Sequence, residues 1–297
     1  NINISILAVI FISILILFLA FVSMLGKNIF YGKGQSLEES MEWQSEHYDT
    51  SFYNGLQKEE FTVKSYDSYV LHGEILKNPT PSSKYVIISH GYKDTRYGSL
   101  KYASIYLSLG YNCIIYDLRG HGANESTFCS YSVREGKDLA EIVHFFQAKL
   151  GRNAEIGLHG ESLGAATTIA SLKDVQNVSF AVADCDIENV LEEIWRYSHI
   201  PTAIGPVMNQ YAKLHFGIPI SAMRPIDSLA KNQVPILFIH GESDQYILPA
   251  NSERMYEATK GKRDLLLVPK AGHAESVFVN KSLYTEKLKD FLSSLAS

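Results

Sequence analysis

A serine flanked by glycines is the strongest chemical signal in the chain. Residues 160–164 read Gly-Glu-Ser-Leu-Gly, with an apolar run before them and a helix-forming run of small residues after them. A strand, a sharp turn with a central serine and a helix together form a nucleophile elbow, which lifts the serine hydroxyl above the strand ends. The pattern predicts Ser162 as a nucleophile. An ordinary strand–helix turn that contains a serine is the alternative.

A serine hydroxyl is a weak nucleophile, so it needs a base, and the base needs a carboxylate to orient it. Asp244 and His273 each follow an apolar run that is typical of a strand. Because functional groups gather beyond the carboxyl ends of parallel strands, we expect both side chains at the same sheet edge as Ser162. Glu242, two residues before Asp244, is the competing candidate for the acid.

Acyl transfer also needs donors for the negative charge that develops on the carbonyl oxygen. Leu163 directly follows the nucleophile at the start of the predicted helix, where the helix dipole favours negative charge. Tyr92 follows the apolar run 85–89, and Gly91 before it lets the backbone approach a substrate. We predict that the backbone N–H groups of Tyr92 and Leu163 form an oxyanion hole.

The elements that must position these residues alternate along residues 57–297. An antiparallel hairpin is expected first, from residues 60–65 and 69–76. Later apolar runs are typical of strands buried on both faces, and they alternate with helical patterns; the runs are 85–89, 112–116, 154–159, 180–183, 235–239 and 265–268. The alternation predicts an α/β fold with a mainly parallel central sheet flanked by helices.

The alternation stops between about residues 187 and 226. Prolines interrupt an apolar and aromatic stretch there, which includes Trp195, Tyr197, Pro201, Pro206, Tyr211 and Phe216. Because ligand pockets are mostly lined by apolar and aromatic side chains, we expect a small helical lid over a cleft. An ordinary packing excursion is the alternative.

Residues 4–25 carry no charge and are almost wholly apolar. A helix of this length spans about 33 Å at about 1.5 Å per residue, enough to cross the hydrocarbon core of a bilayer. We therefore predict membrane association through these residues as a single-pass anchor. A cleaved secretory signal is the alternative, although no small-residue cleavage pattern follows the apolar run.

The sequence thus divides into three parts: an anchor at residues 1–26, a tether at 27–56 and a catalytic domain at 57–297. Lys27 and Lys33 follow the anchor, and positive charge at that point favours a cytoplasmic location for the rest of the chain. The pattern alone does not decide on which side of the membrane the domain lies.

The composition excludes several other classes of protein. The chain has 297 residues, of which 46% are hydrophobic and 20% charged, as in ordinary globular proteins. A net charge of -5 provides no basic surface for nucleic acid. Three cysteines are too few for a disulfide framework, and no metal-binding spacing is present, so we expect no metal or cofactor. The sequence does not indicate an oligomeric state.

The chain resembles α/β-hydrolase-fold serine hydrolases of the serine aminopeptidase/monoacylglycerol-lipase-like and prolyl-oligopeptidase-like kind. The matching segments are residues 87–92, 116–122, 160–164, 235–244 and 271–273. The resemblance implies that Ser162 is the nucleophile, His273 the base and Asp244 the acid. It also implies that Tyr92 and Leu163 form the oxyanion hole.

Two features depart from the family pattern. Ala165 stands where many members have a further glycine, and alanine still permits close helix packing. The N-terminal anchor is not needed by the core fold. The resemblance slightly favours an extracytoplasmic domain, against the signal from Lys27 and Lys33.

These observations predict a serine hydrolase that cleaves carboxylic esters through an acyl-enzyme, because an apolar lid favours a substrate with a hydrophobic part. A serine peptidase or aminopeptidase acting on short peptides is the second reading, with Glu161, Glu192 or Glu193 binding a substrate amino terminus. A non-catalytic, membrane-tethered binding protein is the third, although such a protein has no need for a complete triad.

Overall fold

The computed structural model describes residues 4–32, 34–199 and 201–296, so Lys33 lies outside the described residues. Within them, one eight-stranded sheet has the strand order β1-β2-β4-β3-β5-β6-β7-β8. The strands are β1 (Lys58–Lys64), β2 (Val70–Leu76), β3 (Lys84–Ser89), β4 (Asn112–Tyr116), β5 (Glu155–Glu161), β6 (Phe180–Asp184), β7 (Ile236–Gly241) and β8 (Arg263–Val268). Each predicted apolar run therefore forms a strand.

The sheet is antiparallel only at one edge. Strand β1 pairs antiparallel with β2, as the predicted hairpin requires, and β2 pairs antiparallel with β4. All pairings from β4 through β3, β5, β6 and β7 to β8 are parallel. Ser89 pairs with Gly160, and Glu161 pairs with Asp184, so β3, β5 and β6 end at the same edge. The mainly parallel sheet is confirmed.

Helices cover both faces of the sheet, which explains why its strands are continuous apolar runs. One core cluster contains Ile87, Ile114 and Leu158 and includes side chains of α5 (Val133–Leu150) and α6 (Leu163–Ser171). The other core cluster contains Val86 and Ile115 and includes side chains of α4 (Leu100–Ser108) and α11 (Lys281–Leu295). Shorter helices are η1 (Arg96–Ser99), α9 (Ala250–Ala258) and α10 (Ser276–Val279).

The segment between the apolar helix and β1 folds against the domain. It forms α2 (Leu37–His47) and α3 (Ser51–Gly55), and a capping box between Ser36 and Glu39 starts α2. Tyr48, Phe52 and Tyr53 pack on the core cluster that holds α4 and α11. These aromatic side chains therefore contact the domain.

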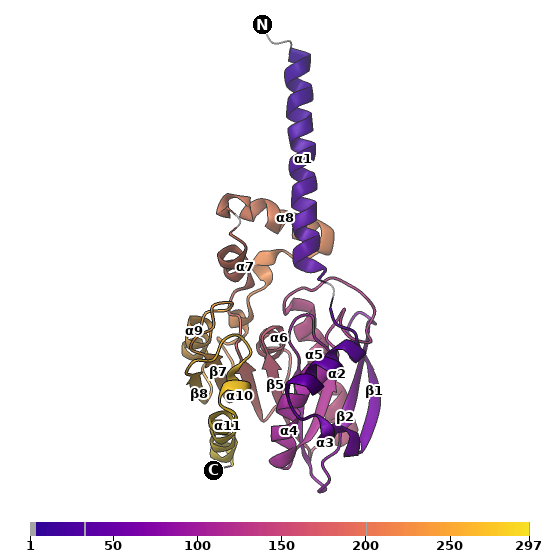
Figure 1. The fold of residues 1–297 in the computed structure, drawn as a ribbon, viewed down its shortest axis with the longest axis vertical. Coiled ribbons are helices and arrows are strands. Elements are labelled where there is room, and N and C mark those ends of the chain that lie inside the picture. Colours follow the sequence, from indigo (N-terminus) through magenta and orange to yellow (C-terminus); the bar gives the residue numbers. More distant parts are fainter. Residues whose placement is uncertain (1–3, 33, 200, 297) are drawn as a thin grey trace.

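Helix α1 (Ile4–Phe30) extends away from the domain, with its N-terminal end far from the sheet (Figure 1). It is long and apolar enough to cross a membrane, and none of its most apolar window is buried. Only its C-terminal part contacts the domain, where Val22, Gly26 and Phe30 are buried. This exposure separates α1 from the buried core helices of globular proteins.

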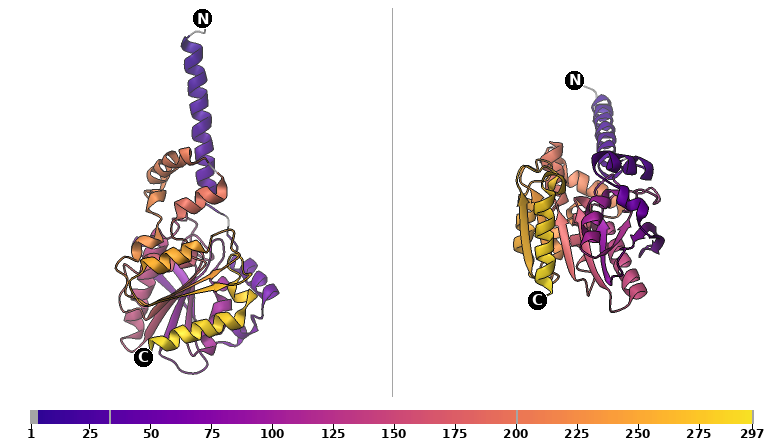
Figure 2. Two further views of the ribbon diagram at one scale, coloured as in Figure 1. Left: turned by 90° about the vertical axis from the view of Figure 1, so that its left-hand side faces the viewer. Right: turned by 60° about the horizontal axis from the view of Figure 1, so that its bottom comes forward.

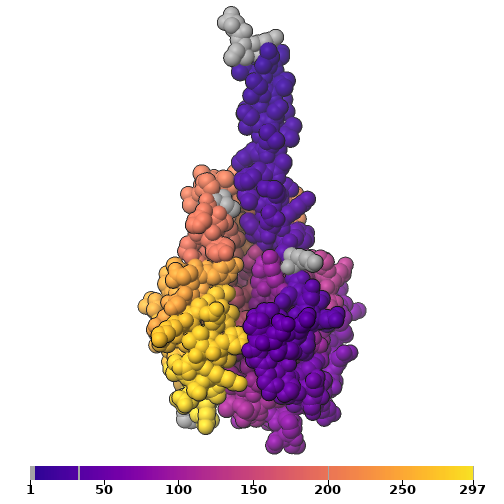
Figure 3. Space-filling model, viewed as in Figure 1, coloured from indigo at the N-terminus to yellow at the C-terminus, as the bar shows by residue number. Residues whose placement is uncertain are grey.

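The predicted lid region forms helices toward the end of the domain from which α1 extends (Figures 2 and 3). These are α7 (Val190–Ser198), η2 (Thr202–Ile204), α8 (Gly205–Phe216), η3 (Ile220–Ala222) and η4 (Pro225–Ser228). Helix α8 contacts α1 so closely that a Cβ at Gly26 would lie 2.1 Å from Cε1 of Tyr211. Glycine therefore allows the two helices to meet. The limits of the anchor, tether, domain and lid stay predictions.

Candidate active site

Ser162 lies in a strained turn between β5 and α6. Its φ of 53° and ψ of -114° are unusual for a residue with a side chain, and such strain often accompanies function. A Cβ at Gly160 would lie 2.0 Å from the carbonyl oxygen of Gly164, and one at Gly164 would lie 2.0 Å from that of Ser89. Only glycine fits at both positions, so the expected elbow geometry has a steric basis.

The structure brings Ser162, His273 and Asp244 together. Oγ of Ser162 lies 2.9 Å from Nε2 of His273, and Nδ1 of His273 lies 2.8 Å from Oδ2 of Asp244. An ionised carboxylate only accepts hydrogen bonds, so Nδ1 carries a proton and donates a hydrogen bond to Asp244. Nε2 is then free to accept the hydroxyl proton of Ser162.

Asp244 is fully buried and lies in the loop after β7. Its Oδ1 accepts hydrogen bonds from the backbone N–H groups of Tyr246 and Ile247, each at 2.9 Å. Burial opposes ionisation, but hydrogen bonds from His240 and His273 outweigh it and hold the pKa of Asp244 below its ordinary value. The carboxylate is therefore kept charged. Glu242, the competing acid, is exposed to solvent instead.

His240 is a second histidine on the same carboxylate, and the sequence analysis missed it. Its Nε2 lies 3.2 Å from Oδ2 of Asp244 and 2.9 Å from the carbonyl oxygen of Ile247. Both partners are acceptors, so Nε2 carries the proton, while Nδ1 faces Oγ of Ser252 at 2.7 Å. The only indication in the sequence is that His240, a polar residue, directly follows the apolar run 235–239.

The two predicted oxyanion donors flank the elbow. Leu163 is the first residue of α6, and the first N–H groups of a helix have no acceptor within it. On the other side, a Cβ at Gly91 would lie 3.9 Å from Cβ of Ser162, which brings the turn that contains Tyr92 close to the nucleophile.

His90 fixes the turn that contains Tyr92. Its Nδ1 lies 2.7 Å from the carbonyl oxygen of Gly91, and its Nε2 accepts the backbone N–H of Leu118 at 2.9 Å. Burial, assisted by repulsion from His121, lowers the pKa of His90 to about 3. The imidazole is therefore neutral, with one nitrogen donating and the other accepting, as its two partners require.

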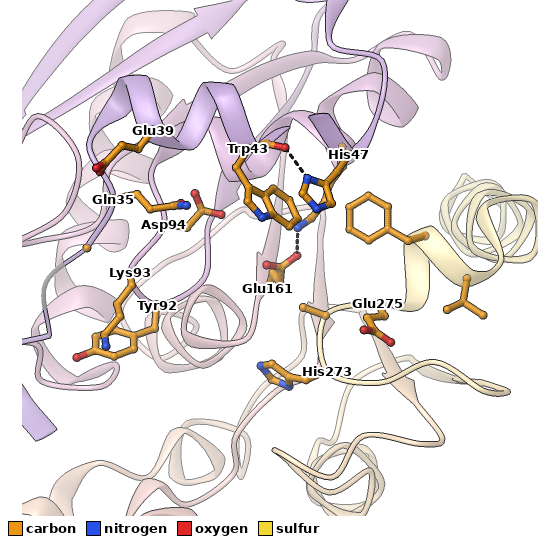
Figure 4. Close-up of a pocket in the computed structure, with 15 residues that line it drawn as sticks. Gln35, Glu39, Trp43, His47, Tyr92, Lys93, Asp94, Glu161, His273 and Glu275 are labelled. Carbon is orange, nitrogen blue, oxygen red and sulfur yellow. Dashed lines mark hydrogen bonds and ion pairs between the residues drawn. The ribbon is translucent and has the colours of Figure 1, made fainter. Parts of the chain in front are cut away.

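Two pockets adjoin the triad, and Tyr92 lines both. A pocket of about 250 Å³ is lined by Ser162 and Leu163 together with apolar and aromatic side chains; these include Tyr92, Tyr131, Ile187, Val190, Ile194, Tyr197 and Ile247. A larger pocket of about 1270 Å³ includes His273. Figure 4 shows Trp43 and His47 of α2 across this larger pocket from His273, with Glu161 between them.

Glu161 precedes the nucleophile and forms a buried ion pair. Its Oε2 lies 2.6 Å from Nζ of Lys101 and also accepts a hydrogen bond from the hydroxyl of Tyr102. Burial opposes the charge on Lys101, but the attraction of Glu161 outweighs it and raises the pKa of the ammonium. The acidic side chain beside the nucleophile is therefore already paired with a cation, and both residues line the larger pocket.

Comparison with known proteins places this site in a family. Residues 98–296 match the prolyl oligopeptidase family. An uncharacterised Bacillus subtilis protein, YqkD, is 30% identical over 248 residues, which are 81% of each chain. An uncharacterised membrane protein of Saccharomyces cerevisiae, YNL320W, is 23% identical over 247 residues, which are 83% of each chain.

Solved structures identify the fold. The Pyrococcus furiosus esterase Pf2001 superposes with a TM-score of 0.66 at 21% identity, covering 83% of this chain and 96% of the esterase. An esterase from Exiguobacterium antarcticum gives 0.57 at 19% identity, with 80% and 99% covered. The sheet is therefore that of the α/β-hydrolase fold. Since the family match extends over more than half of the sequence, the chain belongs to the prolyl oligopeptidase family and is a serine hydrolase.

Proposed function

We propose that this protein hydrolyses carboxylic esters, with Ser162 as nucleophile, His273 as base and Asp244 as the orienting acid. The main support is that His273 contacts both partners: its Nε2 lies 2.9 Å from Oγ of Ser162, and its Nδ1 lies 2.8 Å from Oδ2 of Asp244. Base and nucleophile are within direct proton-transfer distance, and the second contact selects the tautomer that accepts the proton.

The reaction has two acyl-transfer steps. Nε2 of His273 takes the proton of Ser162 as Oγ attacks the ester carbonyl, and the backbone N–H groups of Tyr92 and Leu163 stabilise the oxyanion. The C–O bond to the alcohol then breaks, and His273 returns the proton to the departing oxygen. Water attacks the acyl-enzyme by the same route and releases the carboxylic acid. No cofactor takes part in these steps.

Two of the three acidic side chains considered for a substrate amine, Glu161 and Glu193, are already paired with cations, which supports an ester over a peptide with a free amino terminus. Glu161 is neutralised by Lys101 at 2.6 Å. Glu193 lies 2.7 Å from Arg196 and also accepts a hydrogen bond from Asn251. An ammonium group of a substrate would have to displace these partners. Peptidase activity stays the second candidate, because the family is named for peptide cleavage.

We further propose that α1 anchors the protein in a membrane. The helix exposes its apolar side chains along the part that lies clear of the domain, and burying them in lipid would remove that surface from water. The similar yeast protein is named a membrane protein, which supports the same reading.

The first test is labelling of the full chain in detergent with a fluorophosphonate, which reacts with activated serines. Wild type should be labelled and Ser162→Ala should not, while Ser45→Ala, an exposed serine on α2, should be labelled like wild type. Folded wild type without label would support a binding protein. A panel of p-nitrophenyl esters and aminoacyl anilides then separates the two hydrolases, because a preference for anilides would support the peptidase.

A further inference from the structure

The last turn of the apolar helix forms part of the wall of the active-site pocket. Asn28 and Ile29 of α1 line the 250 Å³ pocket that also contains Ser162. Anchoring a domain at a membrane does not by itself require the anchor helix to line the pocket of the nucleophile. The position of these two residues connects the apolar helix directly to the site of chemistry.

This end of α1 is fixed against the domain. The carbonyl oxygen of Phe30 accepts the backbone N–H of Cys129 at 2.8 Å, and that of Ile29 accepts the hydroxyl of Tyr131. The Phe30 ring is buried and lies 4.8 Å from the ring of Phe216 at the end of α8. The wall is therefore held by hydrogen bonds and by packing on the lid.

The pocket lies just beyond the apolar part of α1. The apolar run ends at Leu25, and the first charged residue is Lys27. Ile29 is four residues after Leu25, which corresponds to about 6 Å along a helix. If α1 spans a bilayer, the pocket lies at the level of the lipid headgroups.

The lid exposes apolar side chains beside α1. Leu214 of α8 is 74% exposed, and Tyr197 of α7 is 60% exposed. Both helices lie at the same end of the domain as α1 (Figure 3). Apolar and aromatic side chains in this position suit the boundary between lipid and water, where such residues are enriched. These exposed side chains are therefore of the kind that contacts the surface of a membrane.

The larger pocket gives the site a polar side. Its lining includes the charged side chains of Lys93, Asp94 and Glu275 as well as His273 (Figure 4), whereas the smaller pocket is mainly apolar. Ser162 lines the smaller pocket, His273 lines the larger one, and Tyr92 lines both. A substrate that fits both has an apolar acyl chain on one side of its ester and a polar alcohol on the other.

We propose that the substrate is a fatty-acyl ester of a polar alcohol that enters from the bilayer along α1. Its acyl chain occupies the apolar pocket, and its alcohol part faces the larger one. A volume of 250 Å³ is below the range of about 300–1,000 Å³ for drug-sized ligands, so a long chain extends out of the pocket beside α1. This inference rests on the proposed esterase activity and on membrane insertion of α1.

The test uses the full chain in vesicles of phosphatidylcholine and phosphatidylglycerol, with umbelliferyl dodecanoate and umbelliferyl butyrate as substrates. At a fixed bulk concentration of dodecanoate ester, adding vesicle lipid lowers its mole fraction in the membrane. The rate should fall with that mole fraction. A rate that follows only the bulk concentration would overturn entry from the bilayer.

Tryptophan substitutions test the wall. Ile29→Trp and Asn28→Trp should each lower the ratio of dodecanoate to butyrate hydrolysis about tenfold, because the larger ring obstructs the path of the chain. Ile16→Trp is the matched control, since Ile16 is 60% exposed on α1, is outside the pocket lining, and lies about 120° or more around the helix from Asn28 and Ile29. It should keep the wild-type ratio. Fluorophosphonate labelling confirms that each variant is folded.

The outcomes separate this inference from the proposed function. Butyrate hydrolysis with an unchanged ratio in both wall variants would leave the esterase standing and overturn the role of α1. A chain that labels with fluorophosphonate but hydrolyses neither ester would overturn both proposals.

Discussion

The Nε2 atom of His240 lies 3.2 Å from Oδ2 of Asp244, the oxygen that also accepts from His273. His240 is fully buried, and its ring nitrogens are hydrogen-bonded to Ser252, Asp244 and Ile247. Its effect on the chemistry passes through the carboxylate, which it orients and helps to keep ionised. His240 is therefore a positioning residue behind the proposed acid.

Replacing His240 tests this role. His240→Phe should lower kcat about tenfold with little change in KM, because a buried hydrogen bond to a charged group is lost. His240→Gln, whose amide can still donate, should recover part of kcat. A purely structural role would lower Tm and reduce kcat in His240→Gln as much as in His240→Phe.

His273→Ala should lower turnover on p-nitrophenyl esters about a thousandfold or more, as losses within a triad generally do. Its side chain is 22% exposed, so we expect Tm to change little. His144→Ala is the control, because that side chain is 48% exposed on α5. Wild-type turnover in His273→Ala would remove this histidine from the mechanism.

Much of the site could be predicted because a parallel sheet relates distant residues by rule. Ser162, Asp244 and His273 each follow a strand, and the carboxyl ends of parallel strands share one edge. The sequence analysis did not need the spacing between them. Recognising the strands from their apolar runs was sufficient to bring the three side chains together.

The contacts that were missed depend on packing between elements with no common pattern. Lys101 of α4 meets Glu161 of β5 only because α4 covers that face of the sheet. The sequence made Glu161 a candidate for binding a substrate amine, but in the structure its carboxylate is paired with Lys101. The position of Ile29 in the pocket wall depends on how α1 packs against the lid, which a hydropathy pattern does not specify.

The pair of Lys101 and Glu161 makes a stability prediction. Lys101→Met leaves a buried carboxylate without its cation, which typically costs about 3–5 kcal/mol, so Tm should fall by several degrees. Adding Glu161→Gln removes the stranded charge and should recover most of the loss. Thermal unfolding of the two single variants and the double variant measures this.

Lys287→Met is the control for the Lys101→Met variant. Lys287 also lies 2.6 Å from a carboxylate, that of Asp264, but both side chains are partly exposed. Surface pairs contribute about 0–1 kcal/mol, so this variant should unfold close to wild type. Equal losses in Lys101→Met and Lys287→Met would show that burial of the first pair has no energetic consequence.

Asp184 gives the protein a pH-dependent stability. It is fully buried at the end of β6, where its Oδ2 accepts a hydrogen bond from the hydroxyl of Tyr284 at 2.9 Å. Burial, and then repulsion by Glu161, raise its pKa from 3.8 to about 6. Between these two values the folded protein holds a proton that the unfolded chain has lost. The resulting stabilisation is complete below pH 3.8 and is lost as the pH rises through 6.

Asp184→Asn should therefore stabilise the protein more at pH 7.5 than at pH 5. The amide is neutral at both values, whereas wild type buries a charge only at the higher pH. The difference between the two gains should be about 1–1.5 kcal/mol, or a few degrees in Tm. Asp174→Asn, at an exposed aspartate, should shift Tm little at either pH. Comparing the Tm of the variant with the Tm of wild type at the same pH removes the contribution of all other titrating groups. A larger gain at pH 5, or equal gains, would mean that Asp184 is already ionised at pH 5 in the folded protein.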